Sequence, residues 1–418
     1  MQRYKEYDNG LRLVVKKLPG MLSVSMGIFV GAGSADGDDS TSGISHFIEH
    51  MMFKGTPTRN AFKIADSIDS IGAQINAYTT KEMTCYHAKC AREHTEKTVE
   101  ILSDIFFNSL FDEAESEKEK KVICEEIAMV EDSPEDLCVD FLAKAHYGDR
   151  YLGRSILGSA ENVKGFTRAH ILNYMDKYYV PSNVVVAMAG AISFDEASRL
   201  VDKYFTHNFK RNGAPIARNG ARRPRPRQLY KFKDIEQVHM CLGFPSMRYD
   251  SRFSNEVALA SIVLGGGMSS RLFQKIREEK GLAYAVYSYP SAYRSSGLFT
   301  IYAAVNPQSS KAVVQLIVRE IKKLTKEGIT QEEFERGKEQ LKSSLIFGQE
   351  STTSVMNAYG KYMMFRGKVL NIEKKIKSIN MMKLEDVNGT IRKIFDFDKL
   401  GASYIGRQES YFDIRSLL

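Results

Sequence analysis

Residues 44–53 read ISHFIEHMMF, and within them His46, Glu49 and His50 form the pattern H-x-x-E-H. At about 100° per residue, a helix over this stretch places its apolar side chains on one face: Ile44, Phe47, Ile48, Met51 and Met52. His46, Glu49 and His50 share the opposite face. A single histidine is usually a core residue with satisfied hydrogen bonds, but that explanation does not account for two histidines and a carboxylate away from the packing face. The pattern favours a metal site, because imidazoles four residues apart can bind one ion.

Zinc suits imidazole and carboxylate ligands, and a catalytic zinc has three protein ligands and a water molecule. A charged segment, 113–130, offers the third ligand. In a helix here, Glu126 shares a face with Val122, Ile123, Ile127 and Val130, and Glu119 lies two turns earlier on nearly the same line. A buried carboxylate needs a counter-charge, which a divalent cation supplies. The alternative is a solvated helix, which we expect for the acids Glu113, Glu115, Glu117 and Glu125.

The same order of predicted elements occurs twice along the chain. The first half has strand-like segments at 10–18 and 22–33, the helix at 44–53, a second strand pair and the charged helix. The second half has a strand at 230–244, a helix at 253–266, a strand pair at 284–305 and helices at 311–328 and 331–348. We therefore predict an α+β protein of two structurally similar domains, each an antiparallel-rich sheet packed with helices, related by internal duplication.

A basic segment, RNGAPIARNGARRPRPR, separates the two halves and contains six arginines between Arg211 and Arg227. A nucleic-acid-binding patch is one interpretation of this charge. Three prolines, two Asn-Gly pairs and the lack of interleaved aromatic residues favour an exposed linker instead. We expect an N-terminal domain at 1–210, a linker at 211–228 and a C-terminal domain at 229–418, and no nucleic-acid partner.

The composition is that of an ordinary globular protein. The chain has 418 residues, of which 43% are hydrophobic and 26% charged, and its net charge is +8. This length is enough for two to four domains of about 100–200 residues each. No apolar run approaches the roughly 18 residues that cross a bilayer, and the five cysteines have no C-x-x-C spacing. We expect a cytoplasmic protein in a reducing compartment, without a membrane partner.

Several segments resemble one peptidase family in family order: GAGSADGDDSTSGISHFIEHMMFKGT, GAQINAYTTKEMTCYHA, YLGRSILGS, YYVPSNVVVAMAG and SSRLFQKIREEKGLAYAVYS. The chain resembles the pitrilysin-type zinc peptidases of family M16. H-x-x-E-H is the inverse of the H-E-x-x-H motif of other zinc peptidases. The likeness covers nearly the whole chain and is strongest to the short two-domain members similar to the catalytic subunit of mitochondrial processing peptidase.

This resemblance implies one zinc ion per chain, held in the N-terminal domain by His46, His50 and Glu126. It implies that Glu49 is the catalytic base and that Glu119 assists the site. Zinc lowers the pKa of a bound water molecule to about 7, so hydroxide becomes available at neutral pH. Glu49 lies on the ligand face without being needed as a ligand, and would pass the proton to the departing amide nitrogen.

The resemblance also assigns substrate contacts to Arg277 and Tyr284 in the C-terminal domain. The residues predict a helix that ends near Lys280, with Gly281 as its left-handed terminator, and a strand that starts near Leu282. Tyr284 would then lie at the rim of a sheet. Without the resemblance, an ion pair between Arg277 and Glu278 or Glu279, and a tyrosine that fills a strand, would be the simpler explanation.

Residues 72–79, GAQINAYT, have the pattern of a strand whose edge could accept an extended peptide by main-chain hydrogen bonds. The resemblance places the substrate on this strand, beside Asn76, Ala77 and Tyr78. From the residues alone, an interior strand is equally compatible.

Two functions follow from these observations. The first is a zinc endopeptidase that hydrolyses peptides or unfolded segments in an enclosed chamber. The second is a non-catalytic scaffold or partner subunit of a related peptidase complex. The intact set of His46, Glu49, His50 and Glu126 favours the first. Longer relatives use four of the repeated units, so the resemblance also implies a homodimer or a heterodimer with a related chain.

Overall fold

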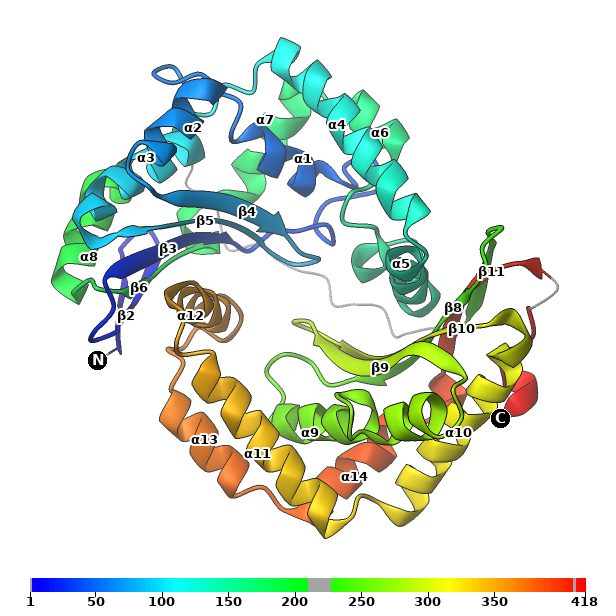
Figure 1. Ribbon diagram of the computed structural model, residues 1–418. Helices are drawn as coiled ribbons and strands as arrows, with labels where there is room; N and C mark the ends of the chain where they lie inside the picture. Colours follow the sequence, from blue (N-terminus) through cyan, green and yellow to red (C-terminus); the bar gives the residue numbers. More distant parts are fainter. Residues whose placement is uncertain (1, 210–226, 409–410) are drawn as a thin grey trace. The chain divides into compact units, whose positions relative to one another are not determined.

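The computed structural model describes residues 2–209, 227–408 and 411–418 (Figure 1). Their contacts divide them into two compact units. Unit 1 comprises the described residues of Met1–Ala128, Ser155–Asn219 and Ile346–Asn371. Unit 2 comprises those of Met129–Arg154, Gly220–Leu345 and Ile372–Leu418. The predicted linker, 211–228, lies outside the described residues except for its last two.

Unit 1 contains a six-stranded sheet in the order β1-β2-β6-β3-β5-β4, in which only β2 and β6 are parallel neighbours. Its central strands are apolar on both faces, as buried strands require. β4 lies at one edge. The strands are β1 (Gln2–Glu6), β2 (Arg12–Lys17), β3 (Ser23–Val30), β4 (Gln74–Thr79), β5 (Thr84–Ala91) and β6 (Val184–Gly190).

Unit 2 contains a five-stranded sheet in the order β7-β11-β8-β10-β9, in which only β7 and β11 are parallel neighbours. The strands are β7 (Gln228–Phe232), β8 (Val238–Ser246), β9 (Ala283–Ala292), β10 (Gly297–Val305) and β11 (Gly401–Gly406). The single strand predicted at 230–244 is thus two strands, because a polar run at 233–237 interrupts it.

The two sheets have one topology. The strands β7-β11-β8-β10-β9 of unit 2 correspond in position to β2-β6-β3-β5-β4 of unit 1, and the correspondence preserves the order of the strands along the chain. The one parallel pair falls at the same place in both sheets, and β1 is an extra edge strand in unit 1. The predicted α+β class with two similar layered units is therefore confirmed, and the shared strand order is what an internal duplication produces.

Helices pack on both faces of each sheet (Figure 1). Those of unit 1 are α1 (Ile44–Met51), α2 (Ala61–Asp69), α3 (Thr95–Asn108), most of α4 (Glu113–Asp132), α6 (Ala160–Gly165), α7 (Arg168–Tyr178), α8 (Phe194–Val201) and α12 (Thr352–Arg366). Those of unit 2 are α5 (Pro134–Tyr147), α9 (Ser254–Gly265), α10 (Ser310–Glu327), most of α11 (Gln331–Phe347), α13 (Ile372–Asn380) and α14 (Leu384–Ile394).

Helix α12 belongs to the sequence of the second half but covers one face of the sheet of unit 1, where it packs on β6, β3 and β2. The Ser25 hydroxyl lies 2.9 Å from the Thr352 hydroxyl and 3.0 Å from the Thr353 hydroxyl. A Cβ atom at Gly360 would lie 2.1 Å from the Phe29 ring, so glycine permits the close approach of this helix.

Helix α5 makes the reciprocal exchange and packs on β11, β8 and β7 of unit 2. The Ser403 hydroxyl donates to the Cys138 carbonyl at 2.6 Å, and the His146 Nε2–H donates to the Gly243 carbonyl at 2.8 Å. Each sheet is therefore covered by a helix from the other half of the sequence. The predicted domains, 1–210 and 229–418, treat each half as contiguous and do not include this exchange.

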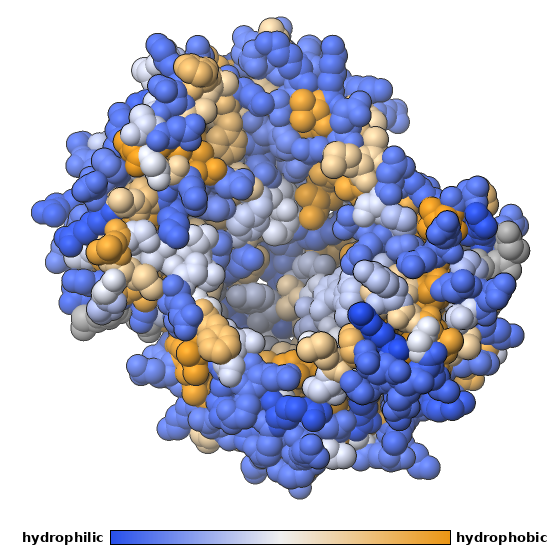
Figure 2. Space-filling model, in the orientation of Figure 1, coloured by the Kyte–Doolittle hydropathy of each residue, from blue (hydrophilic) through white to orange (hydrophobic). Residues whose placement is uncertain are grey.

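No helix among the residues described is both long and apolar enough to cross a membrane. The space-filling view shows polar side chains over most of the surface in view, with small apolar patches between them (Figure 2).

We expect acid to destabilise unit 2 through His146. This side chain is 1% exposed, and burial lowers its pKa to about 4. Between an unfolded-state pKa of about 6.5 and the folded value, only the unfolded chain binds the proton, so the free energy of unfolding falls as pH falls, by roughly 3 kcal/mol near pH 4. Urea denaturation followed by near-UV circular dichroism, at neutral pH and near pH 4, measures this loss.

His146→Gln should reduce the acid-dependent loss, and His207→Gln should not, because His207 is exposed. The quantity compared is the difference between the two pH values within each variant, so an overall loss of stability in His146→Gln does not obscure the result. Equal acid-dependent losses in both variants would contradict the assignment.

Candidate metal centre

Helix α1 holds His46, Glu49 and His50 at the surface of the core of unit 1. It follows Gly43, whose φ of 94° is a left-handed conformation that glycine adopts without strain. As predicted, its apolar residues form the buried face: Ile44, Phe47, Ile48 and Met51. Their burial fixes the rotation of the helix and so the direction of the other face.

Helix α4 brings Glu119 and Glu126 to the same place, but its buried face differs from the predicted one. The buried residues are Ser116, Glu119, Lys120 and Ile123. Val122 is 46% exposed, so its predicted place in the apolar stripe is wrong. At about 100° per residue, Val122 lies roughly 110° from the centre of the buried face. Glu126 lies at the margin of that face, and its side chain is 36% exposed.

His46, His50 and Glu126 each offer one ligand atom, and these three atoms lie within 4.8 Å of one another. The two Nε2 atoms are 3.2 Å apart, and Glu126 Oε2 is 3.6 Å from His46 Nε2 and 3.5 Å from His50 Nε2. Donors about 2.0–2.1 Å from a tetrahedral zinc ion lie about 3.3–3.4 Å from each other. The three residues therefore fit the donor set and spacing of a zinc site.

Glu119 orients one of these ligands. His50 Nδ1–H donates to Glu119 Oε1 at 2.8 Å, which leaves the lone pair on Nε2, toward His46 and Glu126. Lys54 Nζ lies 2.5 Å from the other Glu119 oxygen. Burial alone would raise the pKa of Glu119, but the hydrogen bonds from His50 and Lys54 outweigh it and lower the pKa. The sequence reasoning missed Lys54, for which its spacing four residues after His50 was the only signal.

His46 is the more buried of the two histidines. Burial, and then the charge of His50, lower its pKa to about 4, so the imidazole is neutral at pH 7 and its lone pair is available to a metal. Its Nδ1 atom has no hydrogen-bond partner within the described part of the chain.

Glu49 lies beside this cluster without belonging to it. The Thr79 hydroxyl, at the end of β4, donates to Glu49 Oε2 at 2.5 Å. Burial raises the pKa of Glu49, against the opposing effect of this hydrogen bond. A carboxylate that is held in place and is not a ligand can exchange a proton with a neighbouring water molecule. Sequence reasoning missed Thr79, although strand alternation places it on the face opposite Tyr78.

The strand predicted to bind substrate is an edge strand, which resolves the alternative that the sequence left open. β4 is the last strand of its sheet and pairs only with β5 there. Asn76 and Tyr78 lie on the sheet face away from Thr79, and Tyr78 Oη donates to Asn357 Oδ1 on α12 at 2.7 Å. Ala77 and Thr79 share the face of Glu49.

Arg277 and Tyr284 lie in unit 2, whereas the metal cluster lies in unit 1. Gly281 has a φ of 61°, as its predicted terminating role requires, and Tyr284 is 74% exposed on the edge strand β9. The Arg277 guanidinium lies 5.8 Å from the Tyr284 ring centroid. Arg277 forms no ion pair with Glu278, Glu279 or any other described residue, so the simpler explanation for this arginine is not supported.

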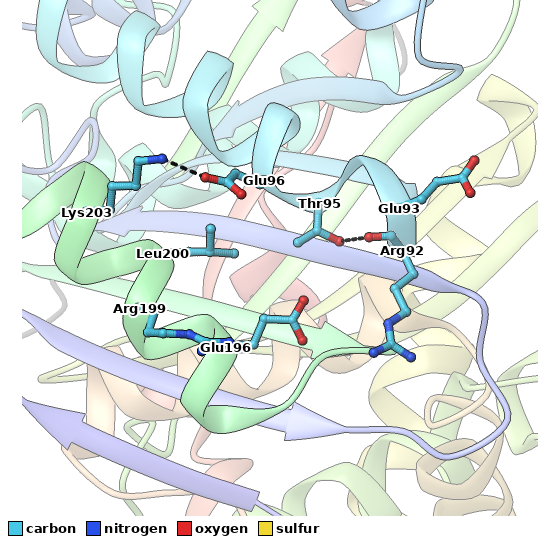
Figure 3. Close-up of a pocket in the computed structure, with 8 residues that line it drawn as sticks. All are labelled: Arg92, Glu93, Thr95, Glu96, Glu196, Arg199, Leu200 and Lys203. Carbon is cyan, nitrogen blue, oxygen red and sulfur yellow. Dashed lines mark hydrogen bonds and ion pairs between the residues drawn. The ribbon is translucent and has the colours of Figure 1, made fainter.

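A separate pocket of about 710 Å³ lies in unit 1 between α3 and α8 (Figure 3). It shares no residue with the metal cluster. Charged surface side chains form most of its wall, and two of them, Lys203 and Glu96, pair at 2.8 Å. We assign no role to it.

Two imidazoles and one carboxylate are a donor set that zinc peptidases use. The model of the insulinase family, peptidase family M16, matches residues 12–160, which include every residue of the cluster. The model described as the peptidase M16 inactive domain matches residues 165–341, which include Arg277 and Tyr284.

The chain belongs to peptidase family M16. It is 42% identical over 393 residues to the "Uncharacterized zinc protease YmxG" of Bacillus subtilis, covering 94% of this chain and 95% of that protein. An uncharacterized zinc protease of Mycobacterium tuberculosis is 36% identical over 402 residues, with 95% and 91% coverage.

Two solved structures have the same fold. A crystal structure described as a peptidase M16 inactive domain, from Pseudomonas fluorescens, has a TM-score of 0.91 at 19% identity and covers 98% of both chains. The crystal structure of a protease from Helicobacter pylori has a TM-score of 0.90 at 22% identity, covering 97% of this chain and 99% of that chain.

We expect Glu126→Gln to lose tight zinc binding, because a neutral amide is a poor zinc ligand. The loss should exceed the roughly 10–100-fold expected for a residue that only supports a ligand. Glu125→Gln is the matched control, since Glu125 is exposed on the same helix and adjacent in sequence. Elemental analysis after equilibrium dialysis compares the two variants. Equal zinc contents would exclude Glu126 as a ligand.

Proposed function

We propose that this protein is a zinc-dependent endopeptidase that cleaves peptides or unfolded segments. The observation that carries the proposal is the convergence of His46 Nε2, His50 Nε2 and Glu126 Oε2 at tetrahedral-ligand spacing. The family membership and the relatives named zinc protease support it. The proposal includes one zinc ion per chain and a cytoplasmic location.

In this proposal His46, His50 and Glu126 hold the zinc, and Glu119 keeps His50 in the required tautomer. When bound, zinc lowers the pKa of water toward 7 and polarises the scissile carbonyl. Glu49 accepts a proton from the attacking water at its carboxylate and returns it to the leaving amide nitrogen. The Thr79 hydroxyl restricts the Glu49 side chain to one orientation, which reduces the entropy lost on reaction.

Substrate contacts are assigned to both units. The free edge of β4, along Asn76, Ala77 and Tyr78, can extend its ladder of main-chain hydrogen bonds with an extended peptide. Arg277 has no ion-pair partner among the residues described and Tyr284 is an exposed phenol, so both are available to hydrogen-bond a substrate carbonyl. The enclosed chamber stays an expectation of the family likeness.

We expect Glu49→Gln and Arg277→Ala to retain stoichiometric zinc and lose peptide cleavage. For Glu49→Gln, removal of the base should lower kcat by about 10²–10⁴-fold. Glu93→Gln, an exposed substitution in unit 1, is the control. Zinc content and cleavage of a degenerate peptide library, with products identified by mass spectrometry, are the measurements. Cleavage by Glu49→Gln at the wild-type rate would refute the base assignment.

The second candidate is a scaffold role, which the description "inactive domain" for the matching C-terminal model and for one solved structure favours. A metal-loaded wild-type protein that cleaves no member of the library would support this candidate over the first.

For either function we propose a dimer, with itself or with a related chain, because each chain supplies only two of the repeated units. If the protein is a homodimer, sedimentation velocity at micromolar concentration should give the mass of two chains. A monomer would exclude the homodimer, and co-purification of a related chain would then identify the heterodimer.

A further inference from the structure

A pocket of about 540 Å³ lies within unit 2, away from any residue assigned above. One wall is the segment that includes Ser269, Ser270, Arg271, Gln274 and Lys275. The opposite wall is one face of α10, with Glu320, Lys323 and Glu327 at helical spacing, and the connection to α11 closes the pocket at 328–333. Apart from Gly328 and Ile329 the lining residues are polar or charged, and the volume falls in the range of small-molecule sites.

Most charges of this pocket are already paired. Arg271 donates from Nε and Nη2 to the two carboxylate oxygens of Glu333, both at 2.7 Å, in a bidentate pair. Lys275 Nζ bonds Glu279 at 2.6 Å, and Lys323 Nζ lies 4.0 Å from Glu327. These pairs leave one acidic side chain of the lining, Glu320, without a counter-ion in contact.

Glu320 is 8% exposed and forms no hydrogen bond or ion pair with any residue that the structure describes. Its neighbours Arg271 Nη1 and Ser270 Oγ are buried and also lack partners there. The Glu320 charge acts on two cations of the lining. Burial would lower the pKa of Arg271, but Glu333 and then Glu320 raise it, and Glu320 adds to the effect of Glu279 in raising the pKa of Lys275. The bidentate edge of Arg271 is nevertheless occupied by Glu333. No described side chain donates a hydrogen bond to the Glu320 carboxylate, so this carboxylate is available to a ligand cation that can.

The complement is not a metal ion held by several side chains. Within the described part of the chain, His46, His50 and Glu126 are the one group of three His, Cys, Asp or Glu residues close enough to hold a metal. Glu320 therefore offers a single carboxylate, which suits an ammonium group. Lys323, which is exposed, lines the same pocket and suits the carboxylate of such a ligand.

We propose that this pocket binds the free α-ammonium group of an amino acid or short peptide, with Glu320 as the residue that contacts it. The ligand carboxylate then lies toward Lys323. The site does not depend on the proposed peptidase activity, since it uses none of the residues of the metal centre.

The test is isothermal titration calorimetry of the zinc-loaded full chain with glycylglycine. Wild type should bind glycylglycine, and Glu320→Gln should bind it at least tenfold more weakly. A loss of this order is expected when one charge-assisted hydrogen bond is removed. Glu332→Gln, an exposed substitution on α11 outside the pocket lining, should keep the affinity. N-acetylglycylglycine, which lacks the ammonium group, should not bind the Glu320-dependent site. Any binding of glycylglycine at the metal centre is common to all three proteins, so the difference between them reports the pocket.

Equal affinity in wild type and Glu320→Gln would overturn the proposal, as would equal binding of the acetylated probe. Circular dichroism and urea denaturation check that Glu320→Gln folds. If it does not, Glu320→Asp keeps the charge on a shorter side chain and should bind glycylglycine more weakly than wild type. A folded Glu320→Asp variant that binds glycylglycine as tightly as wild type, or a wild type that binds the acetylated probe as tightly as the free amine, would then refute the site.

Discussion

The meeting of three donor atoms from two helices is the constraint on which the candidate site depends. His46 and His50 come from α1 and Glu126 from α4, and their ligand atoms are 3.2–3.6 Å apart. Such crowding of lone pairs is unfavourable without a cation between them. It persists because the apolar face of α1 and the residue Ile123 of α4 are buried in the same core, which fixes how both helices are rotated.

The parts of the site that sequence could predict are those that local periodicity determines. One helical turn places His46 and His50 on one face, so the structure brings them together as the spacing required. Glu126 was found by its position among apolar residues, although Val122 proved exposed and the buried face of α4 also carries the charged Glu119 and Lys120. The two strand orders agree because each half repeats the same succession of strand and helix patterns.

The parts that sequence could not predict are contacts between segments far apart in the chain. Thr79 reaches Glu49 only because β4 lies beside α1, and Lys54, just after the end of α1, reaches Glu119 on α4. No local pattern marks Glu320 as the unpaired acid among several paired ones, because pairing is a property of tertiary geometry. The exchange of α5 and α12 likewise leaves no trace in their own residues.

That exchange has a consequence for synthesis on the ribosome. The sheet of unit 1 is complete in sequence at β6, but one of its faces stays uncovered until α12, Thr352–Arg366, has left the exit tunnel. More than a hundred residues are translated in the interval, during which Gly27 and Phe29 are exposed to chaperones. Splitting the gene between the two halves would leave each fragment without the helix that seals its sheet.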